Sequence, residues 1–413
     1  MALTGLAGGP PLLAPGPIAS CARATVDTLT AIADRRCRAH IDGAALLGER
    51  AAIAGFVRSG AVSAGGSCRL LRARDGHVAV SLARPEDFEL IPAWIGETSG
   101  ADAWTHVARR VAARQTEEVV ARARLLGLAV AAAARPPRET PPWYRVAARG
   151  SAVARSPLSR PLVVDLSSLW AGPLCASLLE NAGARVIKVE STRRPDGARR
   201  GPAAFYDLMN AGKESVALDF TDPHDRQILV RLIDRADIVV ESARPRALRQ
   251  LGIDAVERIE RRPGLTWVSI TGYGRDGDEA DWIAFGDDAA VAAGTASALA
   301  TQAGTPVFLA DAIADPLTGI HSALAALAAF DDGGGLLLDL SLRDVTAHAL
   351  VLDPAPTSAR VAESGANGAR RWEVAVGEDR QAVEPPRARS IPERARPLGA
   401  DTRTVLAELG LAC

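Results

Sequence analysis

The sequence lacks the patterns that would assign it to several common classes of protein. Its five cysteines contain no CxxC pair and are odd in number, so neither a metal site nor a disulfide framework is expected. No apolar run approaches the length of a membrane span, and the first residues lack the basic segment of a signal peptide. The net charge of −1 gives no reason to expect a nucleic-acid or membrane partner. These absences favour a cytoplasmic protein.

Lysine is also scarce, since Lys188 and Lys213 are the only two and arginine supplies the other basic side chains. We assign no function to this bias. The chain has 413 residues, 48% of them hydrophobic and 23% charged, which is typical of a globular protein. This length exceeds one ordinary core and predicts two or three domains.

The region 161–275 alternates short apolar runs with helical patterns. Such alternation predicts an α/β fold, in which βαβ units build a parallel sheet. Pro173 lies near the start of the first expected helix, a position that favours proline. A later helix is expected over 315–330. The expected strands are 162–166, 185–190, 215–220, 237–241, 266–271 and 336–340.

The flanking regions carry other signals. The segments 68–73 and 77–82 flank an Arg-Asp-Gly turn, which predicts a hairpin, and helical patterns cover 20–58 and 101–135. The many prolines of 135–160 predict a linker. We place the domain boundaries so that each unit has its own pattern. The expected units are 1–150, with a small domain at about 60–135, a linker at 151–160, a domain at 161–352 and an irregular tail at 353–413, which ends in a short helix at 402–409.

The two ends of the chain share an internal repeat. Residues 1–19 align without gaps on 297–315, with seven identical positions. Chance agreement between two segments rich in Ala, Gly and Pro is the alternative. If the repeat is real, Ala19 matches Asp315, or Ser20 does if one gap is allowed, so only one copy carries a carboxylate.

Candidate ligand-binding residues follow the predicted strands. The first βα junction, 164–173, lacks GxGxxG and so does not favour a nicotinamide or flavin, but its backbone N–H groups can bind a ligand. Arginines follow two later strands, at the end where open α/β sheets bind ligands, and their guanidinium groups suit phosphates. Solvated surface charge is the alternative. These residues are Arg193, Arg194, Arg199, Arg200, Arg244, Arg246 and Arg249.

Acidic residues at helix starts form the other candidate group. Asp315 precedes a proline and a helical pattern, so an N-cap role is the plain alternative to a catalytic one. Asp287 and Asp288 allow the same alternative. No histidine belongs to a Ser/His/Asp arrangement, and His321 and His348 are expected to pack on helices.

Six segments between about 160 and 345 form an ordered set of motifs. They are VVDLSSLWAGPLCASLLENAGARVIKVE (163–190), NAGKESVALDF (210–220), DIVVESARPRALRQLGI (237–253), WVSITGYGRDG (267–277), FGDDAAVAAG (285–294) and ADPLTGIHSALAAL (314–327). In order and spacing, these segments resemble the family III CoA-transferases. This is the CaiB/BaiF type, which includes formyl-CoA and carnitine CoA-transferases and the 2-methylacyl-CoA racemases. The resemblance implies a Rossmann-like CoA-binding domain with a parallel sheet, plus a smaller α+β domain.

The rest of the chain departs from the family's usual plan. Residues 1–150 resemble the second half of the family, which normally follows the catalytic aspartate, so the two halves are rearranged. The stretch 64–81 is similar to the entry into the family's small domain, with a glycine loop at Gly65-Gly66. We interpret 364–372 as a shortened trace of the missing half. The family implies a homodimer, although rearranged halves could let one chain imitate it.

The resemblance implies a mechanism in which Asp315 attacks an acyl-CoA and forms first a mixed anhydride and then an aspartyl-CoA thioester. The glycine loop would cover these intermediates. Coenzyme A and a carboxylic acid are implied as substrates, with no permanently bound cofactor. The implied catalytic residues are Asp315, Gly65 and Gly66, and the implied CoA-binding residues are Ser168, Leu169, Trp170, Ala171, Arg193, Arg244, Arg249 and Asp287.

Two alternatives to transfer remain open. A racemase would need a His/Asp acid–base pair, but the sequence has Phe285-Gly286-Asp287-Asp288 where the family's racemases carry a histidine. A catalytically silent CoA-binding or assembly protein would fit the rearranged halves and the short tail.

Overall fold

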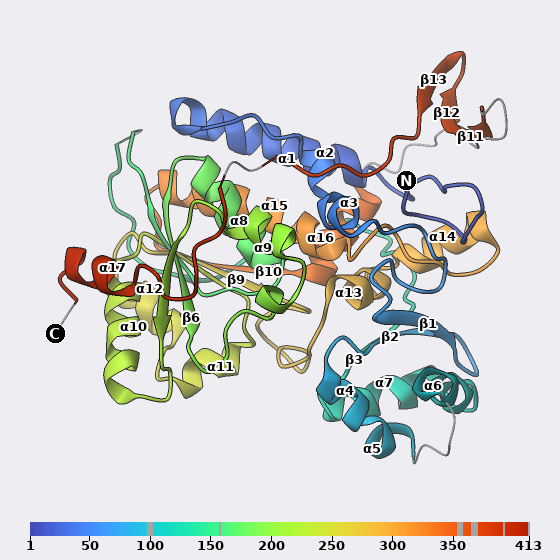
Figure 1. The fold of residues 1–413 in the computed structure, drawn as a ribbon, viewed down its shortest axis with the longest axis horizontal. Coiled ribbons are helices and arrows are strands. Elements are labelled where there is room, and N and C mark those ends of the chain that lie inside the picture. The colour runs from blue at the N-terminus through green and yellow to red at the C-terminus, as the bar shows by residue number, and fades with distance from the viewer. Residues whose placement is uncertain (97–101, 157, 353–357, 365–370, 391–392, 412–413) are drawn as a thin grey trace.

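A seven-stranded sheet forms the centre of the computed structural model, which describes residues 1–413 except 97–101, 157, 353–357, 365–370, 391–392 and 412–413 (Figure 1). The strand order is β4-β10-β9-β8-β5-β6-β7, and all neighbours are parallel except β4 with β10. The strands are β4 (Arg145–Arg149), β5 (Leu162–Asp165), β6 (Arg185–Ser191), β7 (Glu214–Leu218), β8 (Ile238–Glu241), β9 (Thr266–Thr271) and β10 (Leu336–Ser341).

The parallel strands form where apolar runs predict them. Successive side chains point to opposite faces of a strand, and both faces of this sheet are covered, so the strands read as continuous apolar runs. In β5, for example, Val163 packs in one hydrophobic cluster and Val164 in another. The strand order reverses between β5 and β8, which creates the crevice where open α/β sheets bind ligands.

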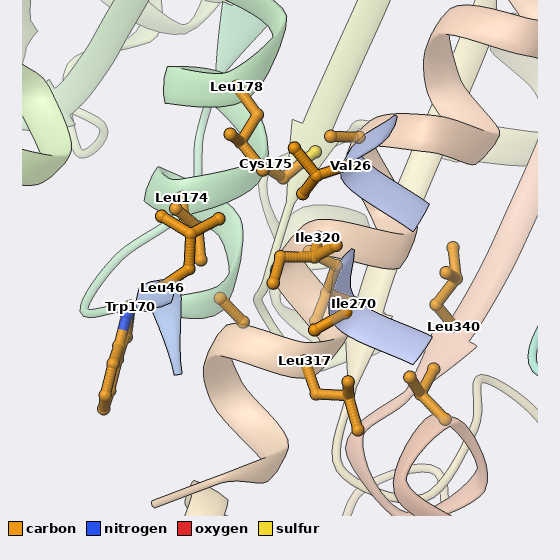
Figure 2. Packing of buried hydrophobic residues seen from close by; sticks show 14 of the residues in the cluster. Val26, Leu46, Trp170, Leu174, Cys175, Leu178, Ile270, Leu317, Ile320 and Leu340 are labelled. Atoms are coloured by element: carbon orange, nitrogen blue, oxygen red, sulfur yellow. The ribbon is translucent and has the colours of Figure 1, made fainter. Parts of the chain in front are cut away.

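One face of the sheet packs against α8 and α15, with α1 and α16 beside α15. Figure 2 shows this packing, with Leu174 and Cys175 of α8 near Leu317 and Ile320 of α15. A second hydrophobic cluster covers the opposite face. The helices of the first face are α1 (Ile18–Ala33), α8 (Ala171–Asn181), α15 (Ala314–Asp331) and α16 (Leu342–Val351); those of the second are α10 (Pro223–Arg235), α11 (Pro245–Gln250), α12 (Ala255–Arg261) and α17 (Thr402–Glu408).

A smaller α+β unit lies to one side of the main sheet (Figure 1). Its antiparallel sheet, β1-β2-β3, contains the predicted hairpin and a third strand that the helical pattern of 101–135 did not predict. This sheet packs against α13 through β2 and β3, and Cys68, Leu70 and Ala79 share a hydrophobic cluster with Val291 of α13. The unit comprises β1 (Cys68–Arg72), β2 (His77–Ser81), α4 (Pro85–Glu89), α5 (Ile91–Ile95), α6 (Ala103–Ala112), α7 (Thr116–Leu125) and β3 (Ala129–Ala132), and α13 is Gly286–Ala292.

The prediction of an α/β fold with a smaller α+β domain is confirmed, but two local predictions are wrong. The expected linker contains β4, which pairs with the edge of the main sheet although its exposed and half-buried residues alternate. The tail, expected to be irregular, forms a meander of β11 (Arg360–Glu363), β12 (Trp372–Val376) and β13 (Asp379–Ala382). Most of the stretch 364–372 lies outside the described residues, whereas the predicted terminal helix is present as α17.

The two copies of the internal repeat both lead into a helix. The alignment pairs Ile18 with Ala314, and these residues begin α1 and α15, which pack against each other. Across the described parts of the chain, no helix is long and apolar enough to cross a membrane. The remaining elements are the short helices α2 (Gly43–Leu46), α3 (Glu49–Ala54), α9 (Ala203–Asn210) and α14 (Thr295–Ala303) and two 3₁₀ turns, η1 (Asp34–Arg36) and η2 (Gly197–Arg200).

Candidate active site

Asp315 lies in the first turn of α15 and does not cap it. The helix begins at Ala314, and the side chain of Asp315 accepts a hydrogen bond from the backbone N–H of Gly286, with the nitrogen 3.1 Å from Oδ2. Gly286 is the first residue of α13, so the carboxylate faces the positive end of a second helix. The N-cap alternative for Asp315 is therefore wrong.

Gly286 can approach Asp315 only because it has no side chain. A Cβ atom at this position would lie 2.5 Å from Asp315 Oδ2 and 2.3 Å from the carbonyl oxygen of Ala312. Real Cβ atoms do not make such contacts, so any other residue would push α13 away from the carboxylate. Sequence reasoning noted Gly286 within a motif but gave it no role.

Three further aspartates are buried next to this carboxylate. Asp287 accepts a hydrogen bond from the backbone of Ala312 (3.0 Å), and Asp311 is fully buried. Asp288 accepts one from the backbone of Phe285 (2.8 Å) at the start of α13, so the helix-start interpretation holds for Asp288. Asp287, by contrast, bonds outside its own helix.

Burial sets the proton affinity of these aspartates. It raises the pKa of Asp315 to about 7, because removing the carboxylate from water disfavours its charge; Arg50 opposes the shift and Asp287 adds to it. Burial likewise raises the pKa of Asp287 to about 7 and that of Asp288 to about 6. The group therefore holds protons near neutral pH, and Asp315 ionises in the same range.

Arg50, which the sequence analysis missed, supplies positive charge to this cluster. It projects from α3 and forms a two-point ion pair with Asp311, with Nε–Oδ2 and Nη2–Oδ1 distances of 2.8 and 2.5 Å. Its guanidinium carbon lies 4.7 Å from the ring centroid of Trp170. No local pattern around Arg50 could have indicated a partner 261 positions away.

The glycine loop lies beside Arg50. A Cβ atom on Gly65 would stand 3.7 Å from Arg50 Nη2, in ordinary contact. Gly66 closes a turn by donating its N–H to Ser63 (2.8 Å), and its φ of +79° is one that favours glycine. Gly65 and Asp315 therefore have Arg50 as a common neighbour.

The βα turn after β5 is already occupied by hydrogen bonds from its own chain. The backbone N–H of Ser168 donates to Ser242 Oγ (3.1 Å) and that of Leu169 to Asp196 Oδ1 (3.0 Å). These two N–H groups are therefore paired within the chain, and a CoA-binding role for Ser168 and Leu169 stays a prediction. The Trp170 side chain is buried beneath Arg50, and Ala171 begins α8.

The two lysines form buried ion pairs next to this turn. Lys188 lies in β6 and pairs with Asp196 (3.0 Å), which in turn holds the N–H of Leu169. Lys213 pairs with Asp165 at the end of β5 (2.9 Å), and both lysines are buried. A lysine within an apolar strand, such as Lys188, needs a buried anion as its partner, and this need could have been predicted from the sequence.

The arginines proposed for CoA binding do not form one group. Arg193 is exposed and pairs with Asp219 (2.9 Å), whereas Arg249 lines a cavity of about 100 Å³ together with Glu241 and Arg275. Arg244 precedes α11; burial lowers its pKa, the neighbouring cations Arg246, Arg84 and Arg194 lower it further, and Asp281 opposes them. A cluster of cations thus surrounds Arg244, and it includes Arg84 of the small unit, which sequence reasoning missed.

The sequence match agrees with this arrangement of fold and site. A model of the family described as "CoA-transferase family III" matches residues 158–376, more than half of the chain. The chain belongs to CoA-transferase family III. The matched region contains Asp315, Gly286 and the Arg244 cluster except Arg84, whereas Arg50 and Gly65 lie before it.

Several curated members of CoA-transferase family III are similar to this chain. The succinate–glutarate CoA-transferase of Agrobacterium fabrum is 32% identical over 213 residues, which cover 48% of this chain and 53% of the relative. The formyl-CoA:oxalate CoA-transferase of Escherichia coli is 29% identical over 200 residues, covering 46% of this chain and 48% of the relative. The chain therefore spans about half the length of the curated relatives it matches.

A solved structure of a CaiB/BaiF family protein from Brucella suis is also similar. It is 28% identical, covers 48% of this chain and 56% of its own, and has a TM-score of 0.40.

Proposed function

We propose that the protein is a CoA-transferase that moves CoA between an acyl-CoA and a carboxylic acid, with Asp315 as the nucleophile. The observation that carries this proposal is the half-buried carboxylate of Asp315, held against the N-terminus of α13 by the N–H of Gly286. Family membership and the names of the curated relatives support the same class of reaction.

In the proposed reaction, an oxygen of the Asp315 carboxylate attacks the thioester carbonyl of the donor. The C–S bond breaks, CoA leaves as a thiolate, and an aspartyl-acyl anhydride remains. The thiolate then attacks the aspartyl carbonyl, which releases the donor acid and gives an aspartyl-CoA thioester. The acceptor carboxylate repeats the two steps in reverse, so Asp315 is regenerated with no net uptake of protons.

The ionisation of Asp315 limits this reaction, because only the carboxylate form is a nucleophile. With a pKa of about 7, Asp315 is partly protonated at neutral pH. Its partial burial also limits the access of water, which would hydrolyse an anhydride. We propose that Gly65-Gly66 covers the intermediates, because Gly65 lies against Arg50 in the same neighbourhood.

The CoA phosphates are proposed to bind at the cations around Arg244. These side chains come from the loops after β6 and β8 and from the small unit, beside the crevice where the strand order reverses. Clustered cations repel one another, and an anionic ligand would relieve this repulsion. Arg84 and Arg246 are themselves paired, with Asp87 and Asp281, so the proposed phosphate contact is Arg244. Arg193 is left out because it lies outside this group and pairs with Asp219.

Mass spectrometry of the protein mixed with a panel of acyl-CoAs tests the proposal. We expect an acyl or CoA adduct on the peptide that contains Asp315, and none on Asp315→Ala or Asp315→Asn, because neither an alanine nor an amide side chain is a competent nucleophile. Both variants should still bind CoA. Substantial exchange by either purified variant would remove Asp315 from its role, and binding without any adduct in the native protein would favour a silent CoA-binding protein.

A further inference from the structure

Arg50 connects three parts of the molecule that are far apart in sequence. Its guanidinium pairs with Asp311, lies over Trp170 and contacts the position of Gly65. Phe56, at 6.0 Å from the guanidinium carbon, closes another side. The ion pair is mostly enclosed, since the side chains of Arg50 and Asp311 are 29% and 0% exposed.

Strained backbone surrounds this ion pair. Among the described residues, the non-glycine residues with positive φ are Asp34, Leu169, Ala310 and Ala312. Ala310 and Ala312 flank Asp311, and Leu169 precedes Trp170. Such conformations are unfavourable for a residue with a side chain and persist where surrounding contacts require them, often at functional sites.

Carboxylates outnumber cations around Asp315, so the positive charge of Arg50 matters for the ionisation of Asp315. Three buried carboxylates, Asp287, Asp288 and Asp311, gather here with the half-buried carboxylate of Asp315 and the buried thiol of Cys68. The cations acting on this group are Arg50 and Arg124, and Arg124 lies nearest Asp288, at 4.0 Å. Arg50 is thus the cation that offsets the charge of Asp315.

We propose that Arg50 is a positioning residue for Asp315: anchored by Asp311, it keeps Asp315 available as a carboxylate and holds the Gly65-Gly66 turn beside the Trp170 turn. The N-terminal segment thereby completes the site within one chain. This inference rests on the proposed transferase function for its catalytic meaning, but the effect of Arg50 on the ionisation of Asp315 can be measured without any substrate.

A titration of Asp315 tests the proposal. The carboxyl group can be followed by NMR in protein labelled at aspartate, with its signal assigned by its loss in Asp315→Asn. In Arg50→Gln we expect the midpoint to move upward by about one pH unit or more, the usual effect of losing a nearby opposite charge. Arg50→Lys keeps the charge and should stay nearer the native midpoint.

Arg389→Gln is a matched control. Arg389 forms a similar two-point ion pair, with Glu49 of the same helix as Arg50, at 2.7 and 3.0 Å. Its removal should disturb α3 without moving the titration of Asp315. If Arg50→Gln fails to fold, Arg50→Met, which keeps an unbranched apolar side chain beside Trp170, serves the same purpose.

Acyl transfer adds a second measurement. Arg50→Gln should lose about fivefold in rate at pH 7 and recover toward the native rate as the pH rises, because a midpoint about one pH unit higher leaves about a fifth as much carboxylate at that pH. An unchanged midpoint in Arg50→Gln, or a loss of rate that is equal at every pH and shared by Arg389→Gln, would overturn the proposal. If the native protein transfers no acyl group, the transferase function fails while the titration still decides the role of Arg50.

Discussion

The half-buried carboxylate of Asp315, the proposed nucleophile, has to combine protection from water with ionisation. Burial raises its pKa to about 7, while Arg50 and the N–H of Gly286 favour the charged form. The lysines illustrate the same physics, since Lys188 and Lys213 are buried only where Asp196 and Asp165 pair with them. The ionisation of these buried and half-buried side chains therefore depends on the opposite charges beside them.

The residue-scale prediction concerns Arg244. Arg244→Gln should weaken CoA binding by roughly 1.5–3 kcal/mol, the scale of one charge-assisted hydrogen bond, and the loss should shrink at high salt. Isothermal titration with CoA at low and high salt measures this. Arg193→Gln, which removes a cation already paired with Asp219, should bind CoA nearly as the native protein does. Equal affinities of both variants and the native protein would exclude a phosphate contact at Arg244.

At the scale of elements, the site depends on two helix starts that meet. Asp315 projects from the first turn of α15, and Gly286 begins α13, so the relative placement of these helices sets the geometry of the carboxylate. The small unit fixes α13 from outside through Cys68, Leu70 and Ala79. This packing, more than the capping of either helix, determines where the carboxylate lies.

Gly286→Ala tests this junction. The added methyl group would overlap Asp315 Oδ2 and the carbonyl of Ala312, so α13 has to shift. We expect acyl transfer to fall by about 100-fold, the scale of a displacement of about 1 Å in an active site, while CoA binding changes little. Gly9→Ala is a suitable control, because its methyl group would meet Leu6 at 3.5 Å, an ordinary contact. Full activity in Gly286→Ala would contradict the close approach of α13 to Asp315.

At the scale of the whole molecule, the N-terminal segment and the family-matched region share one core. Helix α1 packs on α15, and Leu46 of α2 lies near Trp170 in the same cluster (Figure 2). Arg50, in the neighbouring helix α3, extends to Asp311 of the acidic cluster. We expect the two regions to unfold together, because helices from both complete the first hydrophobic cluster of the main sheet.

Global stability should depend on pH through Asp315. Its folded pKa is raised above its unfolded value, so its contribution is present at acidic pH and is lost as the pH rises through about 7. Asp315→Asn removes the charge, and above pH 7 it should therefore raise the free energy of unfolding by ~1–3 kcal/mol relative to the native protein, the scale of relieving a buried polar group of its desolvation penalty. Thermal unfolding at pH 5 and pH 8 checks this, because the gain should be smaller at pH 5. A variant that is less stable than the native protein at pH 8 would contradict the buried charge.

The sequence alone determined the parallel strands, the helix that carries Asp315, the hairpin of the small unit and membership of CoA-transferase family III. Apolar runs, turn residues and ordered motifs are local in the chain, so they can be read without knowing the packing. Only the tertiary structure decided that β4 joins the sheet edge, that Arg84 approaches Arg244 and that Arg50 reaches Asp311. These contacts join residues distant in sequence, and the packing of whole helices and strands, for which no local pattern exists, brings them together.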